Sequence, residues 1–245
     1  MTNSKQSKQQ AKIELAAALR LAAHFGFNEA IDNHFSYALP GEDDRFLLNP
    51  YGLHWSEIRA SNILEVNSDG KVLDGTGEAE GTAFCIHSRI HLLHTRARCV
   101  LHTHMPYATS LAMIEDGKLE PVTQTSLMFH EQVAYDDHYN GLGDNLEEGE
   151  RMAKALHDKR VLFLGGHGVI VVGDTIAETF SDLYYLERAC QAQVLAMSTG
   201  RPLKHIGHNV AGSTFSDRES LARHGRVHFN ALMRLLDRQD PSYAQ

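Results

Sequence analysis

Two histidines two positions apart, His102 and His104, lie at the end of an apolar run that stops before Pro106. In a β-strand, residues i and i+2 point to the same face, so both imidazoles can reach one metal ion. The end of a strand is also where a sheet meets a cleft. Two core or surface histidines would show the same spacing by chance, so the pair needs support from elsewhere in the chain.

A third histidine, His167, lies in a turn that has Gly166 before it and Gly168 after it. Glycine lets the backbone bend sharply and approach a ligand closely. The turn joins two apolar runs, residues 161–164 and 169–172, which would hold the histidine rigidly, as a metal ligand requires. A tight β-turn with an exposed histidine is the alternative.

The elements that position these histidines follow from hydrophobic periodicity and from turn residues. Expected helices cover residues 11–25, 82–95, 106–114, 176–198 and 217–236, and expected strands cover residues 31–39, 45–49, 63–67, 71–73, 97–102, 161–164 and 169–172. Strands alternate with helices, which predicts the α/β class. Hairpins among the strands indicate that the sheet is not purely parallel.

Length and charge narrow the class of protein further. A chain of 245 residues suits one domain, expected over residues 11–245, after a polar and flexible N-terminus over residues 1–10. The formal net charge of −8 leaves no basic face for nucleic acid, and no apolar run is long enough for a membrane span. The three cysteines favour buried free thiols over a disulfide framework. Without an apolar leader segment, we expect a cytoplasmic protein.

Together, the His-Thr-His motif and the Gly-His-Gly turn about sixty residues later resemble the class II aldolase/adducin family. The fuculose-phosphate and ribulose-phosphate aldolases and epimerases typify this family. The resemblance runs over residues 11–197. Asn33 to Ser36 is similar to the family's Asn-x-x-Ser turn, and Asn49 to Gly52 is similar to its Thr-Pro-x-Gly turn.

The resemblance implies a three-layer α/β/α sandwich around a mixed, largely antiparallel sheet. It also implies that His102, His104 and His167 bind one divalent metal, zinc foremost, with manganese or cobalt in relatives. Such a metal acts as a Lewis acid on substrate oxygens. The implied partner is a small-molecule substrate, and the implied assembly is a homotetramer with the site near a subunit interface. The implied substrate-binding residues are Asn33, Asn49 and Gly52.

The chain departs from the sugar-phosphate aldolases just before the helix that precedes the His-Thr-His motif. Counted back from His102, the catalytic glutamate of the aldolases falls on Ala83, and their Ser-Ser pair is missing. Asn49 also stands where their phosphate-binding threonine would be. The chain therefore resembles a divergent, adducin-like branch without the aldolase glutamate, and a sugar phosphate is disfavoured as substrate.

Proton transfer then needs another group. Glu80 would serve if the loop before the helix differs by one turn, although a solvated or helix-capping carboxylate is the alternative. His130 is of a residue type that suits general acid–base work near neutral pH, or it is an ordinary loop histidine. Tyr135 is the third candidate.

Three functions fit these residues. The first is a metal-dependent lyase (an aldehyde-lyase) that cleaves a hydroxy-carbonyl or hydroxy-acid substrate by a retro-aldol reaction. The second is a metal-dependent decarboxylase (a carboxy-lyase) of a hydroxy-carboxylic acid, including aromatic ones, which needs an electron sink but no base to deprotonate a hydroxyl. The third is a non-catalytic, adducin-like interaction module. Retention of all three histidines speaks against the third.

Overall fold

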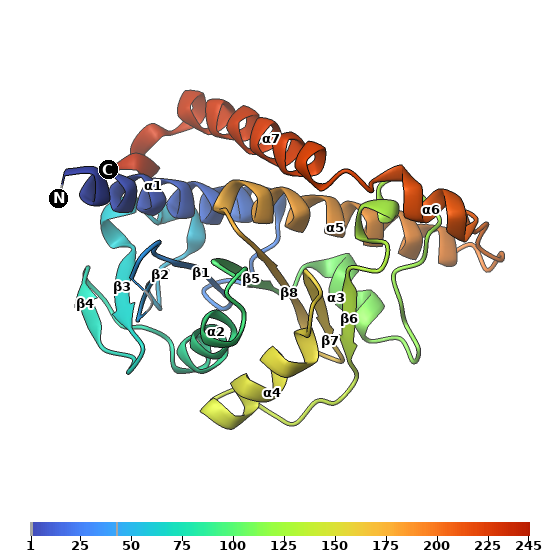
Figure 1. The fold of residues 1–245 in the computed structure, drawn as a ribbon, viewed down its shortest axis with the longest axis horizontal. Coiled ribbons are helices and arrows are strands. Elements are labelled where there is room, and N and C mark those ends of the chain that lie inside the picture. Colours follow the sequence, from blue (N-terminus) through green and yellow to red (C-terminus); the bar gives the residue numbers. More distant parts are fainter. Residues whose placement is uncertain (1, 43) are drawn as a thin grey trace.

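A computed structural model describes residues 2–42 and 44–245, and it is built around one eight-stranded sheet (Figure 1). The strands are β1 (His34–Ala38), β2 (Arg45–Leu48), β3 (Leu64–Asn67), β4 (Val72–Asp74), β5 (Cys99–Thr103), β6 (Val133–Asp136), β7 (Val161–Leu164) and β8 (Gly168–Gly173). Their order in the sheet is β4-β3-β2-β1-β5-β8-β7-β6. The strand that ends in the His-Thr-His motif therefore lies at the middle of the sheet.

All neighbouring strands are antiparallel except β6 and β7, which are parallel. The sheet is thus mixed and largely antiparallel, which confirms the predicted class. On one side of β5, His102 is paired with His34 of β1, and on the other side it is paired with Ile170 of β8.

Helices cover both faces of the sheet, which makes three layers (Figure 1). The helices are α1 (Thr2–Phe25), α2 (Gly81–Leu93), α3 (Pro106–Ala112), α4 (Leu146–Leu156), α5 (Ile176–Met197), α6 (His208–Thr214) and α7 (Arg218–Gln239). The first apolar cluster joins α1 and α5 to one sheet face, and the second joins α2 and α4 to the other. Helix α7 packs on α5, outside the first layer.

Alternate residues of β5 divide between these two clusters. Leu101 packs in the cluster beneath α1 and α5, whereas Val100 packs in the cluster beneath α2 and α4. His102 is two residues after Val100, so its side chain lies on the α2 face of the sheet. The sheet therefore delivers His102 to the layer between the sheet and α2.

The N-terminal prediction needs a correction. We expected the helix to begin at residue 11, but α1 begins at Thr2, while Met1 lies outside the described residues; the expected flexibility of residues 1–10 stays a prediction. Lys8 gives the physical reason, because its ammonium group forms an ion pair of 2.8 Å with the buried carboxylate of Glu65 in β3. Lys8 thus has a partner on the sheet, which ties this part of α1 to β3.

One strand, β6, and two α-helices, α4 and α6, were not expected from the sequence. The remaining expected helices and strands are present: β7 has the expected bounds, and the others differ at one end or both. Cys85, Cys99 and Cys190 are buried free thiols, as expected. Within residues 2–42 and 44–245, no helix combines the length and the apolar character that a membrane span requires.

Candidate metal centre

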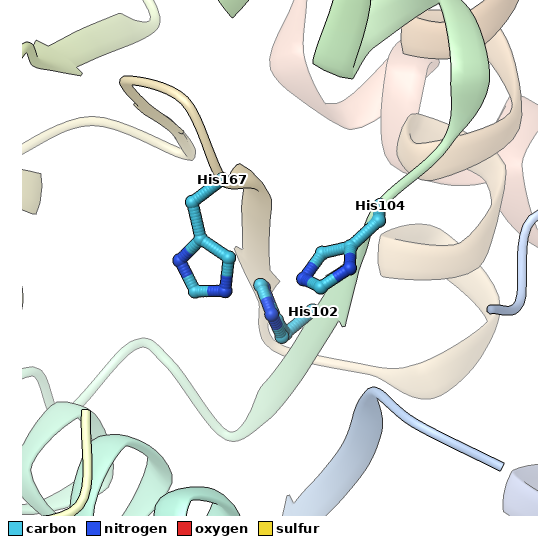
Figure 2. A group of neighbouring side chains, drawn as sticks. All are labelled: His102, His104 and His167. Atoms are coloured by element: carbon cyan, nitrogen blue, oxygen red, sulfur yellow. The ribbon is translucent and has the colours of Figure 1, made fainter. Parts of the chain in front are cut away.

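The central strand and the neighbouring hairpin bring the three predicted histidines together. His102 is in β5, His104 follows it, and His167 is at the tip of the β7–β8 hairpin (Figure 2). Gly168 permits this approach: a Cβ there would lie 2.5 Å from the carbonyl oxygen of Thr103 and 2.8 Å from Cδ2 of His104. Only glycine lets the hairpin tip lie this close to the end of β5.

The three imidazole rings point toward one another in Figure 2. Their centroids are 5.0 Å apart for His102 and His104, and 4.8 Å apart for each of the other two pairs. One ring nitrogen from each histidine lies within 4.8 Å of the other two. Such a cluster can close on one ion with small side-chain rotations, since Zn–N bonds are about 2.0–2.1 Å long.

Outer hydrogen bonds orient two of the rings. Nδ1 of His102 donates to the carbonyl oxygen of Val169 at 3.0 Å, and Nδ1 of His104 donates to the carboxylate of Glu29. A neutral imidazole that donates through Nδ1 has an unprotonated Nε2. Metal-binding histidines commonly have such a carbonyl or carboxylate partner on the second nitrogen.

The hydrogen bonding and the protonation of the ring nitrogens also suit a metal site. Nε2 of His104 is buried and has no hydrogen-bond partner among the residues that the structure describes. Burial lowers the pKa of His102 well below its ordinary value, and the neighbouring His167 lowers it further. Burial and His104 likewise lower the pKa of His167 to about 4. Neutral imidazoles are the form that binds metals.

A chain of buried histidines runs from this cluster into the layer between the sheet and α2. Nδ1 of His34 lies 2.8 Å from Nε2 of His87, and Oγ of Ser36 lies 2.6 Å from Nδ1 of His87 and 2.7 Å from Nε2 of His91. The chain ends where Nδ1 of His91 meets the carbonyl oxygen of Ala97 at 2.7 Å. Burial lowers the pKa of all three histidines, so the rings are neutral.

The carbonyl group at the end of this series of hydrogen bonds determines which atom donates and which accepts in each of them. A carbonyl oxygen only accepts, so His91 donates through Nδ1 and accepts from Ser36 through Nε2. Ser36 then accepts from Nδ1 of His87, and His87 accepts from Nδ1 of His34. His34 is left with a lone pair on Nε2. Its ring lies 5.0 Å from that of His102, so this lone pair belongs to the candidate centre.

Glu80 lies beside this lone pair, with Oε2 3.9 Å from Nε2 of His34. Its carboxylate also caps α2, because it accepts from the backbone N–H of Ala83 at 2.7 Å and from the hydroxyl of Thr82. Burial raises the pKa of Glu80, but the hydrogen bonds from Thr82 and Ala83 outweigh it, and the net direction is downward. Glu80 therefore caps the helix and also lies near His34, and its part in proton transfer stays a prediction. Ala83 itself is buried in an apolar cluster.

The three residues predicted to bind substrate have different surroundings. Asn33 is buried with a φ of 74°, its Oδ1 accepts from the backbone N–H of His104 at 3.4 Å, and its Nδ2 has no partner within the described chain. Asn49 accepts from the backbone N–H of Phe35 at 2.8 Å, so it ties β1 to the loop after β2. Gly52 has a φ of 86° and open space around it. Of these three residues, Asn33 is the one that the described structure shows hydrogen-bonded to a candidate metal ligand.

The other two acid–base candidates lie elsewhere in the chain. His130 and Tyr135 line a cavity of about 250 Å³, and the described residues that line it include none of the three clustered histidines. The hydroxyl of Tyr135 accepts from the backbone N–H of Leu119 at 3.0 Å, and burial raises its pKa to about 12. Within one chain, therefore, neither joins the candidate centre.

Sequence reasoning missed several residues of the centre. Glu29 and His34 reach it from other elements through side-chain contacts that local patterns do not show. Tyr139 was also missed, and its ring lies 6.3 Å from that of His167. Only the unusual number of histidines, 16 in the chain, hinted at a larger polar network.

Comparison with known sequences gives a family match over most of the chain. Residues 13–194 match the family described as the Class II Aldolase and Adducin N-terminal domain. A protein of Caulobacter vibrioides, named provisionally as a class 2 aldolase, is 37% identical over 238 residues, which are 96% of this chain and 92% of that protein. Human beta-adducin is 31% identical over 244 residues, which are 92% of this chain and 33% of that protein.

Solved structures agree with this match. An aldolase II superfamily protein from Pseudomonas syringae superposes with a TM-score of 0.88 and 34% identity, and the match covers 98% of this chain and 96% of that one. An L-fuculose 1-phosphate aldolase from Glaciozyma antarctica superposes with a TM-score of 0.82 and 27% identity, over 97% of this chain and 93% of that one.

Proposed function

This chain belongs to the class II aldolase and adducin family, and we propose that it is a metal-dependent lyase. Its substrate would be an unphosphorylated hydroxy-carbonyl or hydroxy-acid compound, cleaved at a carbon–carbon bond by a retro-aldol reaction. The observation that carries the proposal is the convergence of His102, His104 and His167, with ligand nitrogens within 4.8 Å of one another. A module that only binds proteins has no need of this arrangement.

His102, His104 and His167 would hold the ion, with zinc as the first choice and manganese or cobalt as alternatives. When bound, a divalent ion polarises the oxygens of the substrate and stabilises the negative charge that develops as the bond breaks. Val169 and Glu29 hold two of the rings in the orientation that leaves Nε2 free.

Glu80 and His34 would handle the proton. The lowered pKa of Glu80 keeps it ionised near neutral pH, and Nε2 of His34 offers a lone pair 3.9 Å away. Two acceptors that face one another leave a place for a hydroxyl hydrogen of the substrate. Glu80 would accept this proton, and Thr82 would orient the carboxylate through its own hydrogen bond.

Two features support a substrate without phosphate. Ala83 is buried among apolar side chains and offers no polar group, and the Ser-Ser pair is missing. Close to the histidines, Asn33 presents an unpaired buried N–H₂ group within the described chain, which suits a neutral hydroxyl or a carbonyl oxygen of the substrate.

Decarboxylation of a hydroxy acid is the second candidate, and the capping bonds of Glu80 favour it. A carboxylate that already accepts from Thr82 and from the backbone of Ala83 is a weaker base. Loss of carbon dioxide needs an electron sink but no removal of a hydroxyl proton. The adducin-like module is third, supported by the identity with human beta-adducin.

The test combines metal analysis with product analysis. His102→Ala, His104→Ala and His167→Ala should each lower the bound metal by one equivalent per chain relative to the parent protein, whereas His24→Ala, on an exposed position of α1, should not. Parent-level metal in the first three variants contradicts the site.

With hydroxy-carbonyl and hydroxy-acid substrates, release of an aldehyde identifies aldol cleavage, and release of carbon dioxide identifies decarboxylation. Loss of both products in the histidine variants supports the proposal. Rapid turnover of a sugar phosphate contradicts the predicted substrate class.

We further propose a cytoplasmic homotetramer whose sites lie near subunit interfaces. His130 and Tyr135 would take part in catalysis only if a neighbouring subunit presented them. A monomer in light scattering at micromolar concentration contradicts this assembly.

A further inference from the structure

A second group of metal-ligand side chains lies outside the candidate centre. His130 follows the short helix η3 (Ser126–Phe129), Glu131 is the next residue, and His208 is the first residue of α6. One ligand atom from each of these three side chains lies within 4.8 Å of the other two. The ligand atoms of the first centre lie within the same distance of one another.

His130 and His208 face each other across this group. Their ring centroids are 5.2 Å apart, and the ring planes are inclined at 63°. Nε2 of His130 is buried and lacks a hydrogen-bond partner in the described part of the chain, although the residue as a whole is only partly buried. A buried ring nitrogen without a partner is costly unless something binds to it.

The backbone geometry holds the three side chains together. Glu131 has a φ of 58°, a conformation that non-glycine residues seldom adopt, and it turns the chain directly after His130. On the other side, the backbone N–H of Ile206 donates to the carbonyl oxygen of Pro121 at 2.8 Å, which fixes the segment before α6 against the loop before η3. Strained backbone beside an unsatisfied ligand atom is typical of a functional site.

We propose that His130, Glu131 and His208 bind a second divalent ion, of the borderline class to which zinc belongs. Two imidazoles and one carboxylate are a known donor set for such ions, whereas magnesium and calcium prefer oxygen ligands. The ion joins α6 to the segment before β6, so that it stabilises the position of α6.

The surroundings are consistent with an exchangeable ion. Glu131 and His208 are exposed, so ions reach the site directly from solvent. A second carboxylate, that of Glu120, lies 3.5 Å from His205, three residues before His208, and it adds negative charge to this region. Lys118 is the opposing charge, and its ammonium group lies over the ring of Tyr135, 5.8 Å from the ring centre.

Cobalt(II) is the probe, because its visible absorption reports both binding and geometry. The triple variant His102→Ala, His104→Ala, His167→Ala removes the first centre. We expect it to bind one equivalent of cobalt, with bands that disappear when His208→Ala or Glu131→Gln is added. His157→Ala, an exposed histidine after α4, is the matched control and should leave the spectrum unchanged.

A second measurement avoids the triple variant and any folding defect in it. Native mass spectrometry of the otherwise unaltered protein in zinc should show two ions per chain, and one for His208→Ala. Zinc should also slow hydrogen exchange of the α6 amides, and His208→Ala should remove this effect. If the unaltered chain binds one ion, or if His208→Ala still binds two, the second site is wrong. Both results are independent of lyase activity.

Discussion

Replacement of Glu29 by alanine tests whether a hydrogen bond to a metal-ligand candidate from outside the centre raises its metal affinity. The carboxylate of Glu29 accepts the Nδ1–H of His104, and this bond leaves Nε2 free for a ligand. Without it, the ring of His104 can rotate, and either nitrogen can carry the hydrogen. We therefore expect Glu29→Ala to weaken metal binding without preventing it.

The size of the effect follows from the exposure of Glu29. Loss of an outer partner commonly lowers metal affinity about 10- to 100-fold, or about 1.4–2.8 kcal/mol. The Glu29 side chain is 61% exposed, so water replaces part of what is lost and screens its charge. This places the expected loss near the lower end, at about tenfold. Glu29→Gln keeps an acceptor oxygen and should lose less.

The assay is competition for zinc against a chromophoric chelator at fixed ionic strength. It is run in the His208→Ala background, so that only the first centre contributes. Glu115→Ala, at an exposed position after α3, is the matched control and should bind zinc as the parent does. If Glu29→Ala has the affinity of the parent, the contact with His104 does not support the centre, and the reasoning about outer partners fails.

Three further predictions concern the turn, the histidine chain and the C-terminus. Gly168→Ala should both destabilise the fold and weaken metal binding, because the added Cβ would lie 2.5 Å from a backbone oxygen. Calorimetry should show this loss of stability, and it should show none for the control Gly212→Ala, which has open space around it. Ser36→Ala interrupts the histidine chain, so turnover should fall while metal content measured by elemental analysis stays at the parent value. Hydrogen bonds from Ser242 and Arg20 lower the pKa of Asp240 to about 2. The ionised carboxylate therefore stabilises the fold at pH values above its ordinary pKa of 3.8. The difference in unfolding free energy between the parent and Asp240→Asn should shrink as the pH falls toward 2, and a difference that is constant with pH contradicts this.

The sequence predicted the three histidines of the candidate centre better than it predicted the residues that surround them. His102, His104 and His167 stand in short motifs, a strand end and a glycine-flanked turn, that can be recognised locally. The fold brings them together as expected. Glu29 and His34 lie about seventy residues from their partners along the chain, a separation that no local pattern spans. A carboxylate in a loop and a histidine in a strand have ordinary surroundings until the sheet is assembled.

Helix α4 shows why propensity failed elsewhere. Gly149 lies within it, and glycine costs about 1 kcal/mol in a helix relative to alanine. The structure supplies the reason for it: a Cβ at this position would lie 2.1 Å from the carbonyl oxygen of Cys85, so the glycine lets α4 cross α2 closely. Packing between the two helices requires a glycine here, although glycine by itself disfavours a helix. Strand β6 was missed for a related reason, because four residues are recognisable only beside β7, their parallel partner.

The place of the centre in the middle of the sheet also sets an order of events during folding. His102 and the backbone of Val169 that orients it are 67 residues apart, and β5 and β8 must pair before they meet. Pairing of such distant strands is slow, since the loop between them must first close. The ligands therefore converge only when the central strands are complete, so the ion arrives after the rate-limiting step. Refolding should proceed at the same rate with and without zinc, whereas unfolding should be slower when zinc is bound.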